Sequence, residues 1–218
     1  MNSATEDPAW KQRAVERSIR TAKLRAEQRV QRFLDAAQAI ILENGTMDFT
    51  VQEVVERSRQ SLRSFYLQFD GKHELLVALF EEALINAADQ IRTVAASRPD
   101  PLDRLAVAVQ LLFDLSRPDP TAQRPLFTDF APRLLVTHPA QVKVAHAPLL
   151  ALFVDLVNDA AAAGELRPGL NPRRVAAMTM QTVMFTARSG GNLDDATARP
   201  ITAEEVWKFC ATGVVHQS

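Results

Sequence analysis

The residues whose types and spacing could bind another molecule lie between Gln60 and Phe69, in a stretch with helical periodicity. Phe65 and Phe69 are four residues apart, so on a helix they share one face and are expected to pack inward. An arginine can form two hydrogen bonds with guanine O6 and N7, and a glutamine can pair with adenine. We therefore predict that the outward face contacts nucleic-acid bases or phosphates through Gln60, Ser61, Arg63 and Ser64.

A second short helix is predicted directly before this one. Thr50-Val51-Gln52-Glu53 has the pattern of a capping box, in which the threonine bonds forward and the glutamate bonds back. A break near Ser58 and Arg59 then separates the two helices. This layout is typical of a helix-turn-helix, whose second helix enters the major groove of DNA. The predicted DNA-binding residues, with phosphates assigned to the last three, are Thr50, Gln60, Ser61, Leu62, Arg63, Ser64, Tyr66, Gln68 and Lys72.

The charge distribution favours an anionic partner at this end of the chain. Lys11 to Arg32 holds eight basic and two acidic residues, a net of +6, whereas the whole chain has a formal net charge of −1. This segment lies in one long amphipathic helix, or two nearly collinear ones, expected from Asp7-Pro8 to Asn44-Gly45. Its arginines could form a solvated face, or they could reach additional phosphates or the minor groove. A membrane surface would also suit the charge, although the apolar stripe is rich in alanine and holds one aromatic residue, Phe33.

The rest of the chain is also predicted to be helical. Asp70-Gly71 turns the chain into a long helix that carries several leucines. Prolines divide the helical stretches after Arg98, and Pro148 is expected to kink or restart a helix. About nine helices and no convincing strand are expected, so the fold class is all-α. Further helix ends are expected at Asp100-Pro101, Ala163-Gly164, Asn171-Pro172 and a second capping box, Thr202-Ala203-Glu204-Glu205.

Composition and missing motifs narrow the function classes. Apolar residues make up 47% of the 218 residues, which is enough to form a core. The single cysteine, Cys210, excludes an intramolecular disulfide and fits a reducing cytoplasm. No membrane span or signal peptide is expected, and no metal site, because His138 and His146 have no clear partner ligand. With no catalytic set or cofactor motif, neither an enzyme nor a cofactor is expected.

Three blocks, taken in order, carry a resemblance to a known family. They are Phe33-Leu34-Asp35-Ala36-Ala37, Phe49-Thr50-Val51-Gln52-Glu53-Val54-Val55 and Phe65-Tyr66-Leu67-Gln68-Phe69-Asp70-Gly71-Lys72-His73-Glu74-Leu75-Leu76. Together they resemble the N-terminal domain of the TetR family of transcriptional regulators. The family commonly has Ala-Gly-Val in the turn, where this chain has Ser58-Arg59-Gln60, so a different or slightly strained turn is expected. Arg63 stands where the family usually has a glycine on the DNA face.

The resemblance implies two domains and three partners. Residues 1–72 would form a basic extension and a three-helix DNA-binding domain, and residues 73–218 a larger helical domain for ligand binding and dimerisation. The partners would be a palindromic double-stranded operator, a second copy of the chain and a small apolar ligand, with no membrane. The expected function is repression that the ligand relieves through a lever helix, Leu75 to Arg98. A basic membrane-surface protein and a helical enzyme are the alternatives.

Two groups of residues in the second domain are candidate contacts. The last two helices carry more apolar residues than one monomer is expected to cover. Met178 and Phe185 are among these residues and are also candidate ligand contacts. The candidate ligand-binding residues are Phe113, Phe127, Phe130, Phe153, Met178, Met184 and Phe185. The candidate dimer-interface residues are Thr182, Val206, Trp207, Phe209, Cys210 and Val214.

Overall fold

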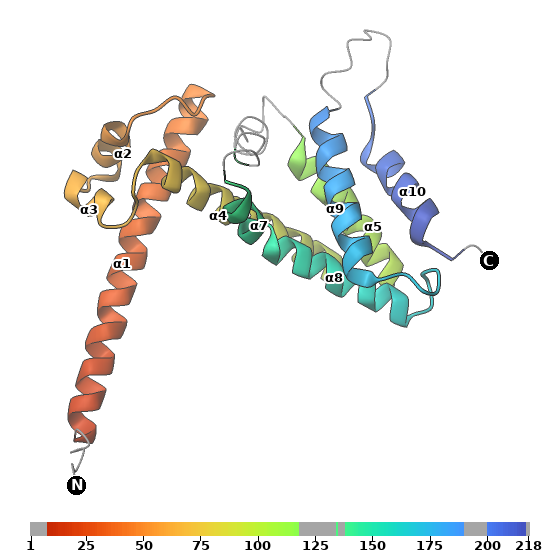
Figure 1. The fold of residues 1–218 in the computed structure, drawn as a ribbon, viewed down its shortest axis with the longest axis horizontal. Helices are drawn as coiled ribbons and strands as arrows, with labels where there is room; N and C mark the ends of the chain where they lie inside the picture. Colours follow the sequence, from red (N-terminus) through yellow and green to blue (C-terminus); the bar gives the residue numbers. More distant parts are fainter. Residues whose placement is uncertain (1–7, 118–133, 135–137, 190–199, 217–218) are drawn as a thin grey trace. The chain divides into compact units, whose positions relative to one another are not determined.

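The computed structural model describes residues 8–117, 134, 138–189 and 200–216, and nine helices lie within these ranges (Figure 1). The only β pairing among the described residues is an isolated antiparallel bridge between Leu166 and Val215. The prediction of an all-α fold is therefore confirmed. The chain divides into two compact units, Met1–Leu75 and Leu76–Ser218.

Helix α1 (Ala9–Asn44) is one continuous helix, as the absence of any glycine or proline inside it predicts. It ends where Gly45 adopts a left-handed conformation (φ 65°) and donates its N–H to the carbonyl oxygen of Ile41 over 2.9 Å. Residues 8–25 are all exposed. The buried part lies near the C-terminal end and consists of Phe33, Leu34, Ala36, Ala37, Ile40 and Ile41.

Helix α2 (Val51–Ser58) begins at the predicted capping box. The backbone N–H of Thr50 donates to a Glu53 carboxylate oxygen over 2.6 Å, and the Thr50 hydroxyl accepts the Glu53 N–H over 3.2 Å. Helix α3 (Leu62–Tyr66) begins after Ser61, whose hydroxyl accepts the Ser64 N–H over 3.1 Å. In both caps the capping residue has an extended backbone, so the helix begins at the residue that follows it.

The expected second helix, from about Gln60 to Phe69, is longer than the observed α3. At its start, the Ser61 cap holds the backbone extended, which excludes Gln60 from the helix. At its end, the N–H groups of Gln68 and Phe69 both donate to the carbonyl oxygen of Phe65, each over 2.9 Å. This shared acceptor closes a turn that keeps Phe69 on the inward side without extending the helix.

An aromatic cluster forms the core of the first unit. The rings of Phe33, Phe65 and Phe69 are all buried, and the Phe33 and Phe65 centroids are 5.3 Å apart in an edge-to-face arrangement. The centroids of Phe65 and Phe69 are 5.4 Å apart. Phe33 lies on α1, so this cluster packs the short α3 and the turn after it against the long helix.

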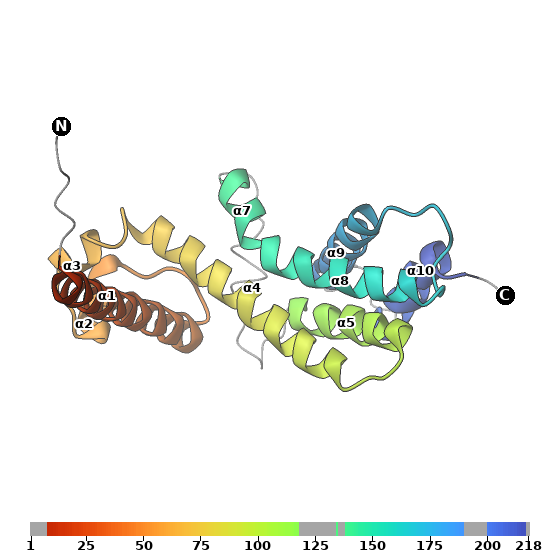
Figure 2. The same cartoon turned by 90° about the horizontal axis from the view of Figure 1, so that it is seen from below.

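The second unit is built mainly from long helices (Figure 2). Helix α4 (Lys72–Ala96) begins in the first unit and continues into the second, and α5 (Pro101–Ser116) follows it. Helix α7 (Pro139–Ala145) leads into α8 (Ala147–Ala162). Helix α9 (Pro172–Ser189) packs against both α8 and α5, and α10 (Ala203–Val214) packs against α5.

Local side chains define the ends of these helices where the sequence predicts them. Asp100 accepts the Asp103 N–H over 2.9 Å, Asn171 accepts the Arg174 N–H over 3.0 Å, and Thr202 forms the second capping box. Pro148 lies in the first turn of α8, where the helix restarts after α7. In the described ranges no single helix has the length and hydropathy of a membrane span; α7 and α8 reach that threshold only together, with a bend of 48° between them.

Candidate nucleic-acid interface

The turn between α2 and α3 carries a backbone conformation that side chains other than glycine rarely adopt. Arg59 has φ 54° and ψ 36°, in the left-handed region, and its N–H donates to the carbonyl oxygen of Glu56 over 3.2 Å. Arg59 is the residue that replaces the family's usual turn glycine, so the strain expected from the sequence is present. The buried Ser58 hydroxyl donates to the Val55 carbonyl oxygen over 3.0 Å, which helps to fix the turn.

Around this turn, the side chains sort as the helical spacing predicts. Phe65 and Phe69 are buried, whereas every residue predicted to contact DNA is exposed or half-buried. The α2–α3 head, which we define as residues 50–72, therefore carries a set of outward polar groups over an aromatic core. Its exposed members among the predicted contacts are Thr50, Ser61, Leu62, Arg63 and Tyr66, and its half-buried ones are Gln60, Ser64, Gln68 and Lys72.

Lys72 is held close to the start of α2. Its ammonium nitrogen lies 4.5 Å from the centroid of the Phe49 ring, a cation–π distance. The pKa of the Glu53 carboxyl is lowered, first by the hydrogen bonds from the Thr50 backbone and hydroxyl and further by the positive charge of Lys72. A cation and a helix N-terminus thus lie together at one edge of the head, which is the pairing that phosphate groups favour.

An ion pair that the sequence analysis missed joins α2 to α1. Both guanidinium NH groups of Arg57 donate to the Glu43 carboxylate, one of them over 2.6 Å. This bidentate contact lowers the pKa of the Glu43 carboxyl below its ordinary value. The partners are 14 residues apart in the chain, and no local spacing rule would pair them. The contact links α2 to the C-terminal end of α1, and the Arg57 guanidinium is paired within the protein.

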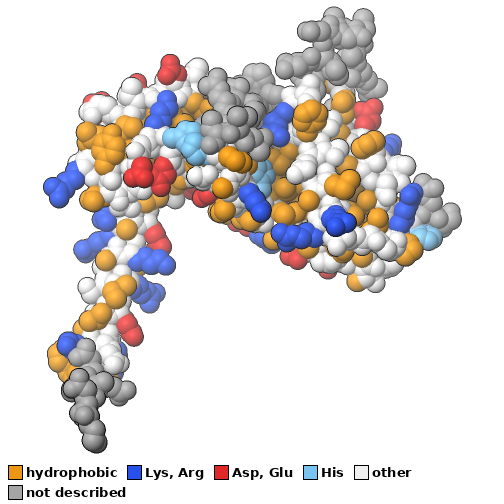
Figure 3. All heavy atoms as spheres, in the orientation of Figure 1, with side chains coloured by type: hydrophobic (Ala, Val, Ile, Leu, Met, Phe, Trp, Pro, Cys, Tyr) orange, Lys and Arg blue, Asp and Glu red, His pale blue; other side chains and the backbone are white. Residues whose placement is uncertain are grey.

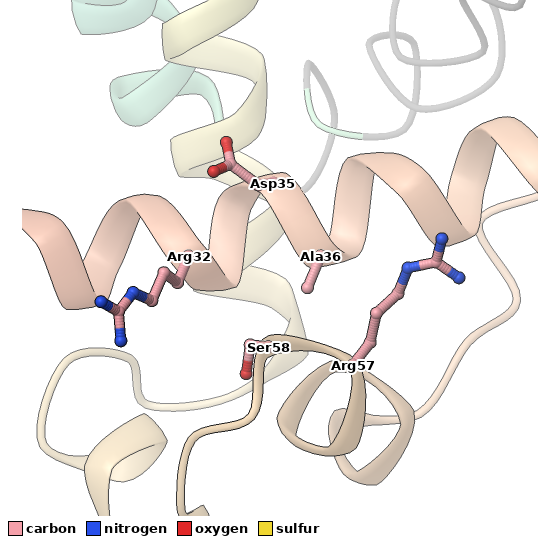
Figure 4. A pocket seen from close by; sticks show the side chains of 5 residues that line it. All are labelled: Arg32, Asp35, Ala36, Arg57 and Ser58. Atoms are coloured by element: carbon pink, nitrogen blue, oxygen red, sulfur yellow. The ribbon is translucent and has the colours of Figure 1, made fainter.

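A solvent-open hollow of about 270 Å³ lies beside this contact (Figure 4). It is lined by Arg32, Asp35 and Ala36 of α1 and by Arg57 and Ser58 of α2. Figure 4 shows the guanidinium groups of Arg32 and Arg57 at opposite ends of the hollow. Its lining is mostly polar, so it differs from the apolar cavity that a hydrophobic ligand would require.

The candidate ligand-binding residues of the second unit divide into three groups. Phe113, Phe153 and Met184 are buried. Met178 and Phe185 are each 68% exposed, which differs from the interior position expected for residues that line a pocket. Their spacing of seven puts them on one side of α9, whereas its buried residues, such as Thr179 and Val183, lie on the opposite side. Phe127 and Phe130 lie outside the described residues.

The candidate dimer residues are spread from the core to the surface of α10 and α9. Val206 is buried within the unit, whereas Phe209 is 72% exposed. Burial raises the pKa of the Cys210 thiol, as befits a half-buried apolar side chain. The exposed apolar residues of α9 and α10 are thus Met178, Phe185 and Phe209, with Thr182, Trp207, Cys210 and Val214 half-buried.

His146 and Arg188 are partly buried basic side chains of the second unit. The His146 ring nitrogen Nδ1 lies 2.7 Å from the Val142 carbonyl oxygen, and the ring meets the edge of Phe80 at 5.4 Å between centroids. Burial lowers the pKa of His146 and also that of Arg188, whose Nε donates to the Met184 carbonyl oxygen over 3.0 Å. No group of three metal-ligating side chains occurs among the residues that the structure describes.

Comparisons with known proteins agree with this arrangement. Residues 33–79 match the family model described as "Bacterial regulatory proteins, tetR family". Over 189 residues the chain is 24% identical to the HTH-type transcriptional activator FasR of Mycolicibacterium smegmatis, and the match covers 85% of this chain and 84% of that protein.

Solved structures with a similar fold cover most of the chain. The transcriptional regulator FadR from Bacillus subtilis, in complex with stearoyl-CoA, has a TM-score of 0.62 at 18% identity and covers 84% of this chain and 98% of its own. RolR in complex with resorcinol has a TM-score of 0.65 at 16% identity and covers 87% of each chain. At these identities the likeness establishes the fold.

Proposed function

We propose that the chain, whose residues 33–79 match the model of the tetR family of bacterial regulatory proteins, is a repressor of that family that binds a palindromic operator as a homodimer and is released by a small apolar molecule. In this proposal it binds DNA as a TetR-type transcriptional regulator, through the part of the chain that matches the family model. The observation that carries the proposal is the α2–α3 head, whose outward side chains are polar over a buried aromatic cluster. We assign DNA binding to residues 1–72, and ligand binding and dimerisation to residues 73–218.

In this proposal α3 lies in the major groove, which is wide enough for a helix. Gln60 and Arg63 then meet base edges, and Ser61, Leu62 and Ser64 lie at the same surface. Phosphates are contacted by Thr50, Tyr66, Gln68 and Lys72 around the rim of the α2–α3 head. Because bacterial DNA lies in the cytoplasm, the proposal places the protein there.

A second copy of the chain is the proposed partner for α9 and α10. Phe185 and Phe209 expose large aromatic surfaces, and such surfaces are usually covered by a partner when several occur together. A two-fold interface also suits a reader of palindromic DNA, because it spaces two recognition helices about one helical turn, or a multiple of it, apart. The half-buried Thr182, Trp207, Cys210 and Val214 would complete this interface, with Val206 supporting it from inside.

The proposed inducer binds among apolar side chains of the second unit. Phe113, Phe153 and Met184 are the buried candidates there. FadR with stearoyl-CoA and RolR with resorcinol are related folds that hold small molecules, which supports a ligand for this chain but not its identity. A ligand can shift the conformational balance only by its different affinity for the two states. Helix α4 runs from one unit into the other and is the proposed lever.

The test is selection of bound sequences from a randomised duplex pool, followed by transcription in vitro from a promoter that carries the selected site. The proposal expects two inverted half-sites whose centres are about one helical turn, or a multiple of it, apart. It also expects that added protein lowers the amount of transcript. If no duplex is retained even at low ionic strength, the DNA-binding assignment fails. If transcript rises with occupancy, the protein is an activator, as FasR is named.

A further inference from the structure

The first half of α1 is an exposed, strongly basic helix that neither the aromatic core nor the α2–α3 head uses. We call residues 9–32 of α1 the basic extension. All of its residues up to Arg25 are exposed, and only Ala26, Arg29 and Val30 in the remainder are half-buried. Figure 3 shows its Lys and Arg side chains spread along the protruding helix. No residue of it belongs to the buried core.

The basic extension is a preformed element. It contains no glycine or proline, and most of its residues are good helix formers such as alanine, arginine, glutamine and lysine. The part of α1 that follows it is anchored by buried residues such as Phe33 and Ala37. The unfavourable nucleation of a helix therefore does not have to occur within the extension itself. At 1.5 Å per residue the extension spans on the order of 35 Å, about one turn of duplex DNA.

Few of its positive charges are neutralised within the protein. The Lys23 ammonium nitrogen lies 3.8 Å from a Glu27 carboxylate oxygen. Among the described residues this is the only ion pair within the basic extension. The arginines that have no carboxylate partner in the described ranges are Arg13, Arg17, Arg20, Arg25, Arg29 and Arg32. Unpaired cations along a rigid helix require a partner that carries regularly spaced negative charge or remain fully solvated.

The arrangement of apolar residues argues against a lipid surface. At 100° per residue, Val15 and Ile19 lie on one side of the helix and Trp10 and Leu24 on roughly the opposite side. All four side chains are exposed, so the large apolar groups are divided between two faces. A helix that lies in a membrane interface gathers them on one face. A second copy of the extension is also disfavoured, because two segments of +6 charge repel each other.

From these observations we propose that the basic extension is a second DNA contact that binds phosphates of the duplex beyond the base pairs that α3 reads. The contact is independent of sequence, because it uses charge on an exposed helix and no side chain held against a base edge. Arg13, Arg17 and Arg20 share one face in the N-terminal half of the basic extension, away from the α2–α3 packing, and carry the distal part of the contact. The inference rests on the proposed DNA-binding function.

The test measures how the dissociation constant for DNA depends on salt. The duplexes are the site selected from the randomised pool, either alone or with one helical turn added on each side. The variants are R13Q/R17Q/R20Q, which removes three charges, and R13K/R17K/R20K, which keeps them. All three positions are exposed, so both variants should keep the helical content of the wild type.

The proposal expects the wild type and the lysine variant to bind the longer duplex more tightly and with a steeper salt slope. For each extension that contacts DNA, the glutamine variant should lose about 2.7 from the slope of log K against log salt. It should also lose its preference for the longer duplex. The affinity of each protein for the short site, divided by its affinity for a random duplex, should stay unchanged.

Two outcomes would overturn the inference separately from the proposed function. If the wild type selects a site but the glutamine variant keeps the same slope and length preference, the extension is a solvated face. If the glutamine variant instead loses binding to vesicles of equal phosphatidylcholine and phosphatidylglycerol, with DNA binding unchanged, the extension is a lipid contact. If the wild type selects no duplex at all, the proposed function itself fails.

Discussion

The α2–α3 head and the helix pair α9–α10 place their large side chains in opposite ways. In the head, Phe65 and Phe69 are buried beside Phe33, and the outward residues are mainly polar. On α9 and α10, Phe185 and Phe209 point outward and are 68% and 72% exposed. Exposed polar side chains over a buried core are typical of a surface that binds hydrated, charged DNA. Exposed aromatic rings are typical of a surface that binds another protein. The difference separates two kinds of partner within one chain.

The sharpest way to test the closed core is Phe65→Ala. The Phe65 ring is fully buried between Phe33 and Phe69, so its removal should leave a cavity and lower the free energy of unfolding by about 3–5 kcal/mol. Denaturant unfolding at fixed protein concentration measures this. Trp10→Ala, at an exposed ring of α1 outside the proposed dimer interface, is the control for loss of an aromatic side chain. A Phe65→Ala loss below about 1 kcal/mol would contradict the description of the head.

The outward rings of α9 and α10 should matter for association more than for folding. Phe185→Asp combined with Phe209→Asp should weaken the dimer by about 100-fold or more, because buried aromatic anchors dominate interface energies. Sedimentation equilibrium measures the change, and circular dichroism checks that helical content is kept. Leu67→Asp is the control, since Leu67 is 71% exposed but lies in the head. If the double variant dimerises as tightly as the wild type, Phe185 and Phe209 do not bind a second copy, and the proposed difference in partner between the two regions is wrong.

The two regions also contain matched capping boxes, at Thr50 and Thr202. In each, the threonine hydroxyl accepts the backbone N–H of a glutamate over 3.2 Å. Thr50→Ala and Thr202→Ala should each cost about 1 kcal/mol of stability, and serine at either position should restore most of it. Thermal unfolding compares the four variants. Equal losses for serine and alanine would mean that the hydroxyl is not the stabilising group.

A smaller and opposite effect is expected at the turn of the head. Arg59 occupies the left-handed region, which costs a residue with a Cβ about 1–2 kcal/mol. Arg59→Gly should remove that strain, at some cost in chain entropy, and stabilise the protein by about 0.5–1 kcal/mol. Arg59→Ala keeps the Cβ and should change little. The pair of variants can be compared by chemical unfolding, where destabilisation by glycine would show that the turn is unstrained.

Local chemistry explains why much of the fold was predictable from the sequence. Thr50, Asp100 and Thr202 accept hydrogen bonds from backbone groups within three residues, so their motifs fix helix starts without tertiary information. Gly45 ends α1 for a similarly local reason. The outward residues of the head were predictable because Phe65 and Phe69 mark the inward side.

What could not be predicted depends on contacts between distant parts of the chain. The Arg57–Glu43 ion pair and the hollow beside it require α1 and α2 to be packed together first. The late start of α3 depends on the Ser61 cap, and its early end depends on the shared acceptor at Phe65, which competes with continued helix. The exposure of Met178 and Phe185 was not predictable, because α9 carries apolar residues on both sides and periodicity alone does not say which side faces the core.

The most direct measurement of the central claim is the ratio of affinities for the selected site and for a random duplex, compared between the wild type and Arg63→Ala. Arg92→Ala, at an exposed arginine of α4, controls for the loss of one positive charge. If Arg63 meets a base edge, its removal should lower the ratio by about 5- to 150-fold, which corresponds to about 1–3 kcal/mol, while affinity for the random duplex changes little. Equal losses on both duplexes would place Arg63 on a phosphate and contradict the claim that the α2–α3 head reads sequence through this residue.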